Sequence, residues 1–168
     1  MKGNETKTVL AGEQYVEKNH PAIELRGCID SMHARAVYTC TFARQYGYPE
    51  IVAGLEDIVR VTREIMRSDA TGQPPDVQDI LGLDLDEIRE VSNNPQSELG
   101  ISHYMPDAHA DEMTALLNML RTDVRRTERA AVAAGTGDGA MEGIQLVLNR
   151  LSGAVYILML ENRAEKEF

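Results

Sequence analysis

The sequence predicts an all-α protein, a bundle of four long helices and one short helix. Two observations predict it. Apolar residues recur at steps of three and four in four separate stretches, and Gly and Pro residues punctuate the chain between them. The chain has 168 residues, 43% of them hydrophobic, which is enough for one core without disulfide or metal cross-links. We therefore interpret residues 1–168 as a single domain, with residues 1–18 as an extended N-terminal segment.

The first two helices are expected to pack as antiparallel neighbours. Pro21 opens the first helix, because proline is tolerated in a first turn, where its missing N–H costs nothing. Gly47-Tyr48-Pro49 ends it, and the second helix stops near residues 69–75, which contain Gly72 and two prolines. The expected core positions are Ile29, Met32, Ala36, Cys40 and Ala43 in the first helix and Ile51, Leu55, Ile58, Thr62 and Ile65 in the second.

The second half of the chain begins with a long connection and ends with two more long helices. Residues 70–106 are rich in Pro and Gly, and only Leu85-Asp86-Glu87-Ile88 predicts a brief helix there. Asp107 is expected to cap the third long helix, which closes at Ala134-Gly135, and the fourth starts after Gly139. The expected core positions are Met113, Leu117, Leu120, Val124, Thr127 and Ala131, then Ile144, Val147, Leu151, Val155 and Leu158.

Charge and cysteine usage limit the possible functions and locations. The net charge of −10 argues against a nucleic-acid partner, so any anionic substrate must meet a local basic patch. Cys28 and Cys40 lie about 18 Å apart along one predicted helix, too far for a disulfide. The first residues lack the apolar core of a signal peptide, and no later stretch is expected to reach a membrane span. A reducing cytoplasm is the expected location.

Four arginines between positions 121 and 129 stand out in this acidic chain. Arg121, Arg125 and Glu128 fall at steps of four and three, so they share one helix face beside the core stripe, whereas Arg126 and Arg129 point further away. Guanidinium groups at the edge of a core suit a polyphosphate. A solvated face with weak intrahelical ion pairs is the alternative interpretation.

Two polar residues on other helices fall beside core positions. Asn149 lies between the apolar Leu148 and Leu151, and Asp30 directly follows Ile29. Asn149 could add to the site of the arginine face, and a capping or tie residue is the alternative interpretation. Asp30 could pair with an arginine of the third long helix, and a purely structural salt bridge explains it equally well.

Three stretches of the chain together carry a family resemblance. They are residues 67–74 (Arg-Ser-Asp-Ala-Thr-Gly-Gln-Pro), residues 116–125 (Leu-Leu-Asn-Met-Leu-Arg-Thr-Asp-Val-Arg) and residues 148–156 (Leu-Asn-Arg-Leu-Ser-Gly-Ala-Val-Tyr). In order and separation they resemble the ethanolamine-utilisation type of ATP:corrinoid adenosyltransferases. Residues 17–21 and 26–31 look like the start of the same domain, so the resemblance spans roughly residues 10–160.

The pattern Arg-x-x-x-Arg-Arg-x-Glu that starts at Arg121, followed by Leu-Asn-Arg-Leu-Ser, is also similar to the propanediol-utilisation adenosyltransferases. Those are trimers of five-helix subunits that bind ATP between neighbouring subunits, and the resemblance implies a homotrimer here. It also implies the reaction, which is transfer of the 5′-deoxyadenosyl group of ATP to the cobalt(I) of cobalamin, with release of triphosphate and help from Mg²⁺. A reductase and an adenosylcobalamin-dependent enzyme would be partners, and a bacterial microcompartment a further location.

The resemblance also implies the site residues. They are Arg121, Arg125, Glu128 and Asp30 for catalysis; Lys18, Arg121, Arg125, Asn149, Arg150, Thr6 and Thr8 for ATP; and Tyr104, Met105 and Asp69 for the corrinoid. Asp30 would pair with Arg121 across a helix or subunit boundary. The loop His103-Tyr104-Met105-Pro106 is the candidate plug that displaces the lower axial ligand of cobalt. The Gly- and Thr-rich phosphate loop of the propanediol type has only Thr6-Lys7-Thr8 and Gly12 as counterparts.

No tightly bound transition metal is expected, because the chain lacks the His and clustered Cys of the metal-binding extension that ethanolamine-type members can carry. His103 and His109 are expected to be surface or loop residues. Two other functions stay open. One is a corrinoid carrier or sensor that has lost catalysis, and the other is a structural bundle whose arginine face docks an acidic partner.

Overall fold

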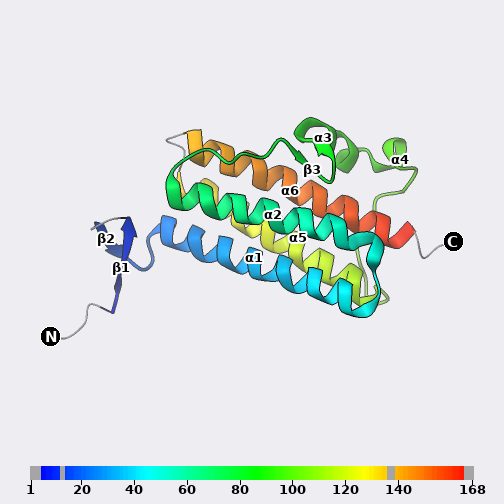
Figure 1. Cartoon of the computed structure of the whole chain (residues 1–168), viewed down its shortest axis with the longest axis horizontal. Helices are drawn as coiled ribbons and strands as arrows, with labels where there is room; N and C mark the ends of the chain where they lie inside the picture. Colours follow the sequence, from blue (N-terminus) through cyan, green and yellow to red (C-terminus); the bar gives the residue numbers. More distant parts are fainter. Residues whose placement is uncertain (1–4, 12–13, 136–138, 165–168) are drawn as a thin grey trace.

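The protein is an antiparallel bundle of four long helices in a computed structural model that describes residues 5–11, 14–135 and 139–164 (Figure 1). The helices are α1 (Pro21–Tyr46), α2 (Pro49–Thr71), α5 (Glu112–Ala134) and α6 (Gly139–Ala164). Helix α1 packs on α2 and α5, and α6 packs on α5 and α2. All the core positions predicted from the apolar spacing are buried, so the four long helices and their inward faces are confirmed.

The helix ends follow local chemistry. Pro21 occupies the first turn of α1, where His20 Nδ1 accepts a hydrogen bond from the Ala22 N–H at 3.2 Å. Gly47 and Gly72 end α1 and α2 in the left-handed conformation, with φ of 79° and 67°. The start predicted for α5 is wrong. Asp111, not Asp107, caps this helix by accepting from the Thr114 N–H at 3.1 Å.

The connection between α2 and α5 has more structure than the one brief helix predicted. Helix α3 (Leu85–Asn93) forms as expected and begins with a capping box, but the short helix α4 (Pro95–Glu98) was not predicted. The described residues therefore contain six helices, one more than expected. A small hairpin of β3 (Asp79–Ile80) and β4 (Leu83–Asp84) precedes α3.

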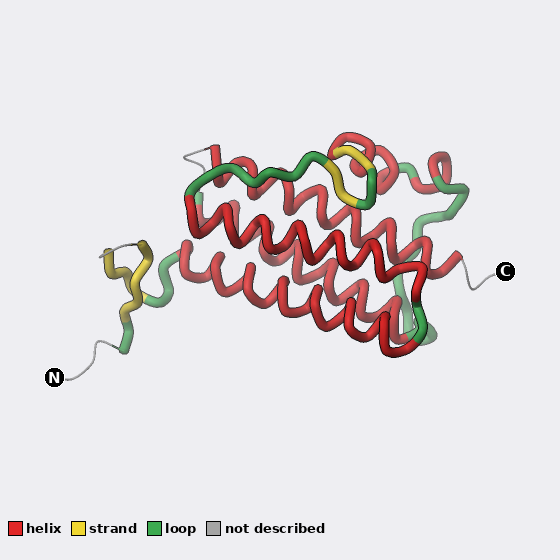
Figure 2. Tube along the Cα trace, in the orientation of Figure 1, coloured by secondary structure: helices red, strands yellow, loops and turns green. Residues whose placement is uncertain are grey.

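The described part of the N-terminal segment forms two paired strands. Strands β1 (Lys7–Ala11) and β2 (Gln14–Glu17) form an antiparallel hairpin that projects beyond one end of the bundle (Figures 1 and 2). Arg26 ties this hairpin to α1, because its Nη1 donates to the Leu10 carbonyl at 3.2 Å. Gly12 lies outside the described residues.

The expectation that no stretch reaches the length and apolar composition of a membrane span is wrong for helix α6. By length and composition, Gly139–Ala164 is apolar enough to cross a membrane. However, 61% of its most apolar window is buried inside the protein, where α6 packs against α2, α3 and α5. Packing on three neighbours accounts for this composition, which core helices share with membrane helices.

Both cysteines are free thiols, as their spacing predicted. Cys28 and Cys40 are buried in α1, and this burial raises the pKa of each thiol.

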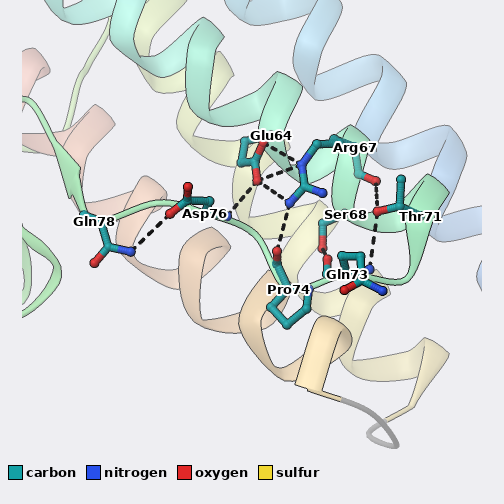
Figure 3. A network of polar contacts seen from close by, with 8 residues as sticks. All are labelled: Glu64, Arg67, Ser68, Thr71, Gln73, Pro74, Asp76 and Gln78. Atoms are coloured by element: carbon teal, nitrogen blue, oxygen red, sulfur yellow. Dashed lines mark hydrogen bonds and ion pairs between the residues drawn. The ribbon is translucent and has the colours of Figure 1, made fainter.

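The segment that follows α2 is held to that helix by polar contacts (Figure 3). Arg67 Nη2 donates to the Pro74 carbonyl at 2.9 Å, and Ser68 Oγ donates to the Gln73 carbonyl at 2.6 Å. Glu64 forms an ion pair with Arg67 at 2.6 Å, which lowers the pKa of the Glu64 carboxyl. Much of the stretch 67–74 that carried the family resemblance thus has a structural role.

We expect Gly143→Ala to destabilise the fold. A Cβ at Gly143 would lie 2.7 Å from Cδ of Pro75, and a proline ring cannot rotate away. The overpacking should cost about 1–3 kcal/mol of unfolding free energy, measured by urea unfolding followed by circular dichroism. Gly27→Ala is the matched control, because Gly27 is exposed in α1 with nothing within 4 Å of its Cβ position. This control should gain up to about 1 kcal/mol from helix propensity. Equal effects of the two changes would contradict the packing argument.

Candidate active site

A cavity of about 790 Å³ opens between α3, α5, α6 and the loop that precedes α5. Helix α3 can lie close to α6 because Gly153 has no side chain. A Cβ there would lie 2.9 Å from Ser92 Oγ and 3.1 Å from Ile88 Cγ2. The residues that line the cavity are Ile88, Arg89, Ser92, Asn93, His103, Tyr104, Met105, Arg121, Arg125, Asn149, Arg150, Ser152, Gly153 and Tyr156.

The cavity wall is strongly basic. It carries Arg89 from α3, Arg121 and Arg125 from α5 and Arg150 from α6, and no carboxylate is among the described residues that line it. Because the whole chain has a net charge of −10, this is the local basic patch that an anionic substrate would need.

Arg121 is the least satisfied of these arginines. Its Nε is buried and has no hydrogen-bond partner among the described residues, and its Cζ lies 4.9 Å from the centre of the Tyr156 ring. Burial lowers the pKa of Arg121, and the charge of Arg125 lowers it further. An anion bound between Arg121 and Arg125 would act against both effects, because its negative charge would stabilise the two guanidinium groups.

A series of hydrogen bonds connects three other predicted site residues, Glu128, Asn149 and Arg150, beside this wall. Asn149 Nδ2 donates to Glu128 Oε1 at 2.9 Å, and Arg150 Nη1 donates to Asn149 Oδ1 at 2.6 Å. Arg150 Nε also donates to the Leu85 carbonyl at 2.6 Å. Asn149 and Arg150 therefore link α5, α6 and the start of α3. Glu128 lies next to the cavity through its bond to Asn149, but it is not one of the lining residues.

The loop before α5 closes the cavity from another side. The Tyr104 N–H donates to the Tyr156 hydroxyl at 3.0 Å, and the Tyr104 ring lies under Arg163, whose Cζ is 4.2 Å from the ring centre. Met105 follows with 71% of its surface exposed, an unusual state for a large apolar side chain on a cavity wall.

The structure brings together most of the predicted site residues and leaves the others elsewhere. Those that line the cavity are Arg121, Arg125, Asn149, Arg150, Tyr104 and Met105. Those outside it are Glu128, which joins it through Asn149, and Thr6, Thr8, Lys18, Asp30 and Asp69.

The residues outside the cavity have other contacts within the chain. Thr6 and Thr8 lie in or beside β1, and the Lys18 N–H donates to the Thr6 carbonyl at 2.8 Å. Asp69 Oδ2 accepts from Arg26 Nε at 2.9 Å, so Asp69 joins α2 to α1 and is not part of the cavity wall.

Asp30 is exposed on α1 and has no hydrogen bond or ion pair within the described part of the chain. Since Arg121 packs on Tyr156, Asp30 and Arg121 are not paired within one chain. Their pairing across a subunit boundary stays a prediction.

Eight of the fourteen lining residues were not among the site residues inferred from the sequence, and three of the eight, Tyr156, His103 and Arg89, carry a ring or a guanidinium group. Tyr156 ends the stretch 148–156 that carried the resemblance, so its position in that stretch was the available signal. His103 was expected to be a loop histidine within the candidate plug, and it does lie in that loop, where it also lines the cavity and lies 3.1 Å from the Tyr156 hydroxyl. Arg89 follows the buried Ile88 in α3, and only the packing of α3 on α6 brings it to the site.

Comparison with known proteins assigns the chain to a family. Residues 1–161 match the family model described as cobalamin adenosyltransferase, so the chain belongs to that family. Its curated relatives include the corrinoid adenosyltransferase EutT of Escherichia coli K12, which is 35% identical over 159 residues, covering 93% of this chain and 58% of the relative. EutT of Salmonella typhimurium LT2 is 34% identical over 163 residues, covering 95% and 60%. The chain thus spans about three fifths of the length of these relatives. The resemblance inferred from the three stretches is confirmed.

Solved structures share the fold. One is a PduO-type ATP:corrinoid adenosyltransferase from Lactobacillus reuteri, in a variant with one phenylalanine replaced by alanine, complexed with cobalamin and ATP. It superimposes with a TM-score of 0.71 at 19% identity, and the match covers 98% of this chain and 93% of that one. A second variant of the same enzyme, with histidine in place of the phenylalanine, gives 0.69 at 19% identity, covering 98% and 90%. The predicted fold type, a helical bundle of the adenosyltransferase kind, is confirmed.

We expect inorganic tripolyphosphate to raise the melting temperature of the protein, because it would occupy the cluster of Arg121 and Arg125. A ligand at a hundredfold excess over its Kd adds about 2.7 kcal/mol of stability, which corresponds to a shift of several degrees. Arg121→Gln should remove most of this shift. The matched change Arg129→Gln, on the same helix but outside the cavity, should retain it. A shift that is the same in both variants would place the anion site elsewhere.

Proposed function

We propose that this chain is an ATP:cob(I)alamin adenosyltransferase, which moves the 5′-deoxyadenosyl group of ATP to a reduced corrinoid and releases triphosphate. One observation carries the proposal. A single cavity combines a four-arginine wall, a buried Arg121 Nε without a partner among the described residues, and an exposed apolar loop residue, Met105. The family, the EutT relatives, and neighbours complexed with cobalamin and ATP support it.

The reaction requires the protein to align the two substrates and to stabilise the charge on the leaving triphosphate. The cobalt(I) of the corrinoid attacks the 5′ carbon of ATP, a cobalt–carbon bond forms, and the carbon–oxygen bond breaks as its electron pair leaves with triphosphate. Cobalt(I) is a strong nucleophile, so no general base is needed. Arg121 and Arg125 offset the charge that gathers on the leaving triphosphate. Arg121 lines the cavity and forms no ion pair among the described residues, so its guanidinium group would supply donors for that role.

Mg²⁺ fits this site as an ion carried by the triphosphate. Magnesium in proteins is commonly held by one or two carboxylates together with substrate phosphates. Glu128, bonded to the cavity residue Asn149, is the carboxylate that would hold it here. The ion would supply further positive charge against the leaving group.

The loop of Tyr104 and Met105 is the proposed corrinoid contact. Met105 offers an exposed, polarizable and adaptable side chain, which suits the face of a large flat macrocycle. The loop lies across the same cavity as Arg121, so the two substrates would meet between the loop and α5.

We also propose a homotrimer in which the N-terminal hairpin of one subunit completes the ATP site of its neighbour. The hairpin projects beyond the bundle, and its Thr6, Thr8 and Lys18 do not line the cavity of their own chain (Figure 1). The exposed Asp30 would then be free to pair with Arg121 of the neighbour. A cytoplasmic location, a reductase and an adenosylcobalamin-dependent enzyme as partners belong to the same proposal.

Light scattering of the purified chain should give three times the mass of the 18.6 kDa subunit. Asp30→Arg should lower that mass or raise the protein concentration needed to maintain it, because it would place two positive charges together at the proposed boundary. A monomer at all concentrations would overturn the trimer.

The activity itself is tested by mixing the protein with ATP, Mg²⁺ and chemically reduced cobalamin and measuring adenosylcobalamin and triphosphate. We expect both products in equal amounts. Arg125→Ala should lower the turnover number about 100-fold, because it removes a donor that acts on the leaving group. Arg129→Ala, the matched control, should stay near the wild type, and both variants should keep the helical circular dichroism signal. Full turnover by Arg125→Ala would refute the assignment.

A corrinoid carrier without catalysis is the second candidate, favoured by one observation. Thr6, Thr8 and Lys18 lie away from the cavity within the chain, so a single subunit offers fewer contacts for ATP. Corrinoid binding without product, in the same assay, would support the carrier.

A further inference from the structure

Tyr156 contacts both sides of the cavity. Its ring lies beneath the Arg121 guanidinium on one side, with 4.9 Å between Cζ and the ring centre. Its hydroxyl lies within hydrogen-bond distance of His103 and Tyr104, in the loop on the other side. Only 8% of Tyr156 is exposed, so packing of α6 in the core fixes where this side chain can be.

The hydroxyl anchors the loop through a connected set of hydrogen bonds. It accepts from the Tyr104 N–H at 3.0 Å and lies 3.1 Å from His103 Nδ1, while His103 Nε2 lies 3.2 Å from the Asn93 carbonyl. Since a carbonyl can only accept, the contact with Asn93 assigns the imidazole proton to Nε2. The single Tyr156 O–H proton then has two acceptors in the loop, His103 Nδ1 and the Tyr104 carbonyl at 3.3 Å. The loop is thereby tied both to α6 and to the C-terminal end of α3.

The ring holds Arg121 without neutralising its charge. An aromatic face attracts a guanidinium but takes none of its N–H groups as an ion pair would. Within the described residues the buried Arg121 Nε has no hydrogen-bond partner, and the Arg121 side chain lines the cavity in which an anion would bind.

We infer that Tyr156 is a positioning residue with two separable roles. Its hydroxyl sets the loop His103-Tyr104-Met105 for the corrinoid, and its ring sets Arg121 for the triphosphate. The inference rests on the proposed function. Because the roles use different atoms of one side chain, two substitutions distinguish them. Tyr156→Phe removes only the hydroxyl, whereas Tyr156→Leu removes the ring as well.

The test is steady-state kinetics of the full chain, with KM measured separately for ATP and for reduced cobalamin. Tyr156→Phe should raise the KM for cobalamin about 3–10-fold, the effect expected from lost hydrogen bonds, and should leave the KM for ATP within about twofold. Tyr156→Leu should raise both. His103→Ala should reproduce the Phe pattern, because it loosens the same loop. Tyr38→Phe, at a tyrosine of α1 that is 55% exposed, is the matched control and should change neither.

A general loss of packing would raise both KM values together in Tyr156→Phe, and that result would overturn the inference, as would an unchanged KM for cobalamin. If the wild type forms no adenosylcobalamin, the proposed function fails first, and binding is measured in its place. Tyr156→Phe should then weaken cobalamin binding in difference spectra and leave the thermal shift with tripolyphosphate unchanged. A wild type that binds neither ligand would overturn both proposals.

Discussion

The contact between Arg121 and Tyr156 is the interaction on which the site depends. The Arg121 guanidinium is partly buried at the junction of α5 and α6, where desolvation and the neighbouring Arg125 both act against its charge. Most buried arginines recover this cost in an ion pair. Here an aromatic face takes that place, and the buried Nε of the guanidinium has no hydrogen-bond partner in the part of the chain that the structure describes. The folded protein is thus modestly destabilised at Arg121, and an anionic ligand bound there would remove this destabilisation.

The rest of the cavity follows from what keeps α3 in place over α6. Gly153 permits the close approach of the two helices, and Arg150 bonds to the Leu85 carbonyl at the start of α3. His103 contacts the carbonyl of Asn93 at the other end of that helix. Helix α3 is too short to be stable alone, and residues of the site hold it at both ends. The same contacts therefore set the shape of the cavity and position its polar side chains.

Much of the fold could be predicted from the sequence, because the long helices have regular apolar spacing and clear terminal residues such as Pro21 and Gly47. The apolar spacing did not predict the pairing of β1 with β2, the helix α4 or the start of α5. In the last case Asp107 and Asp111 are chemically equivalent caps, and Asp107 instead accepts from the His109 N–H in a turn. At the site, helical periodicity placed Arg121 and Arg125 on one face. The contributions of Arg89 and His103 depend on tertiary packing between segments that are distant in sequence, which no local pattern encodes.

Helix α6 supplies Asn149, Arg150 and Tyr156 to the cavity while most of its other side chains are buried against three neighbouring helices. A helix enclosed in this way cannot turn or slide without disturbing the core, so core packing holds these three residues in place. The opposite wall is a loop with an exposed methionine, and loops tolerate exchange far better than a core helix does. The two walls therefore differ in how readily they can evolve. The arginine side is constrained by the fold itself, whereas the loop side is where related chains could acquire a different ligand preference at little cost in stability.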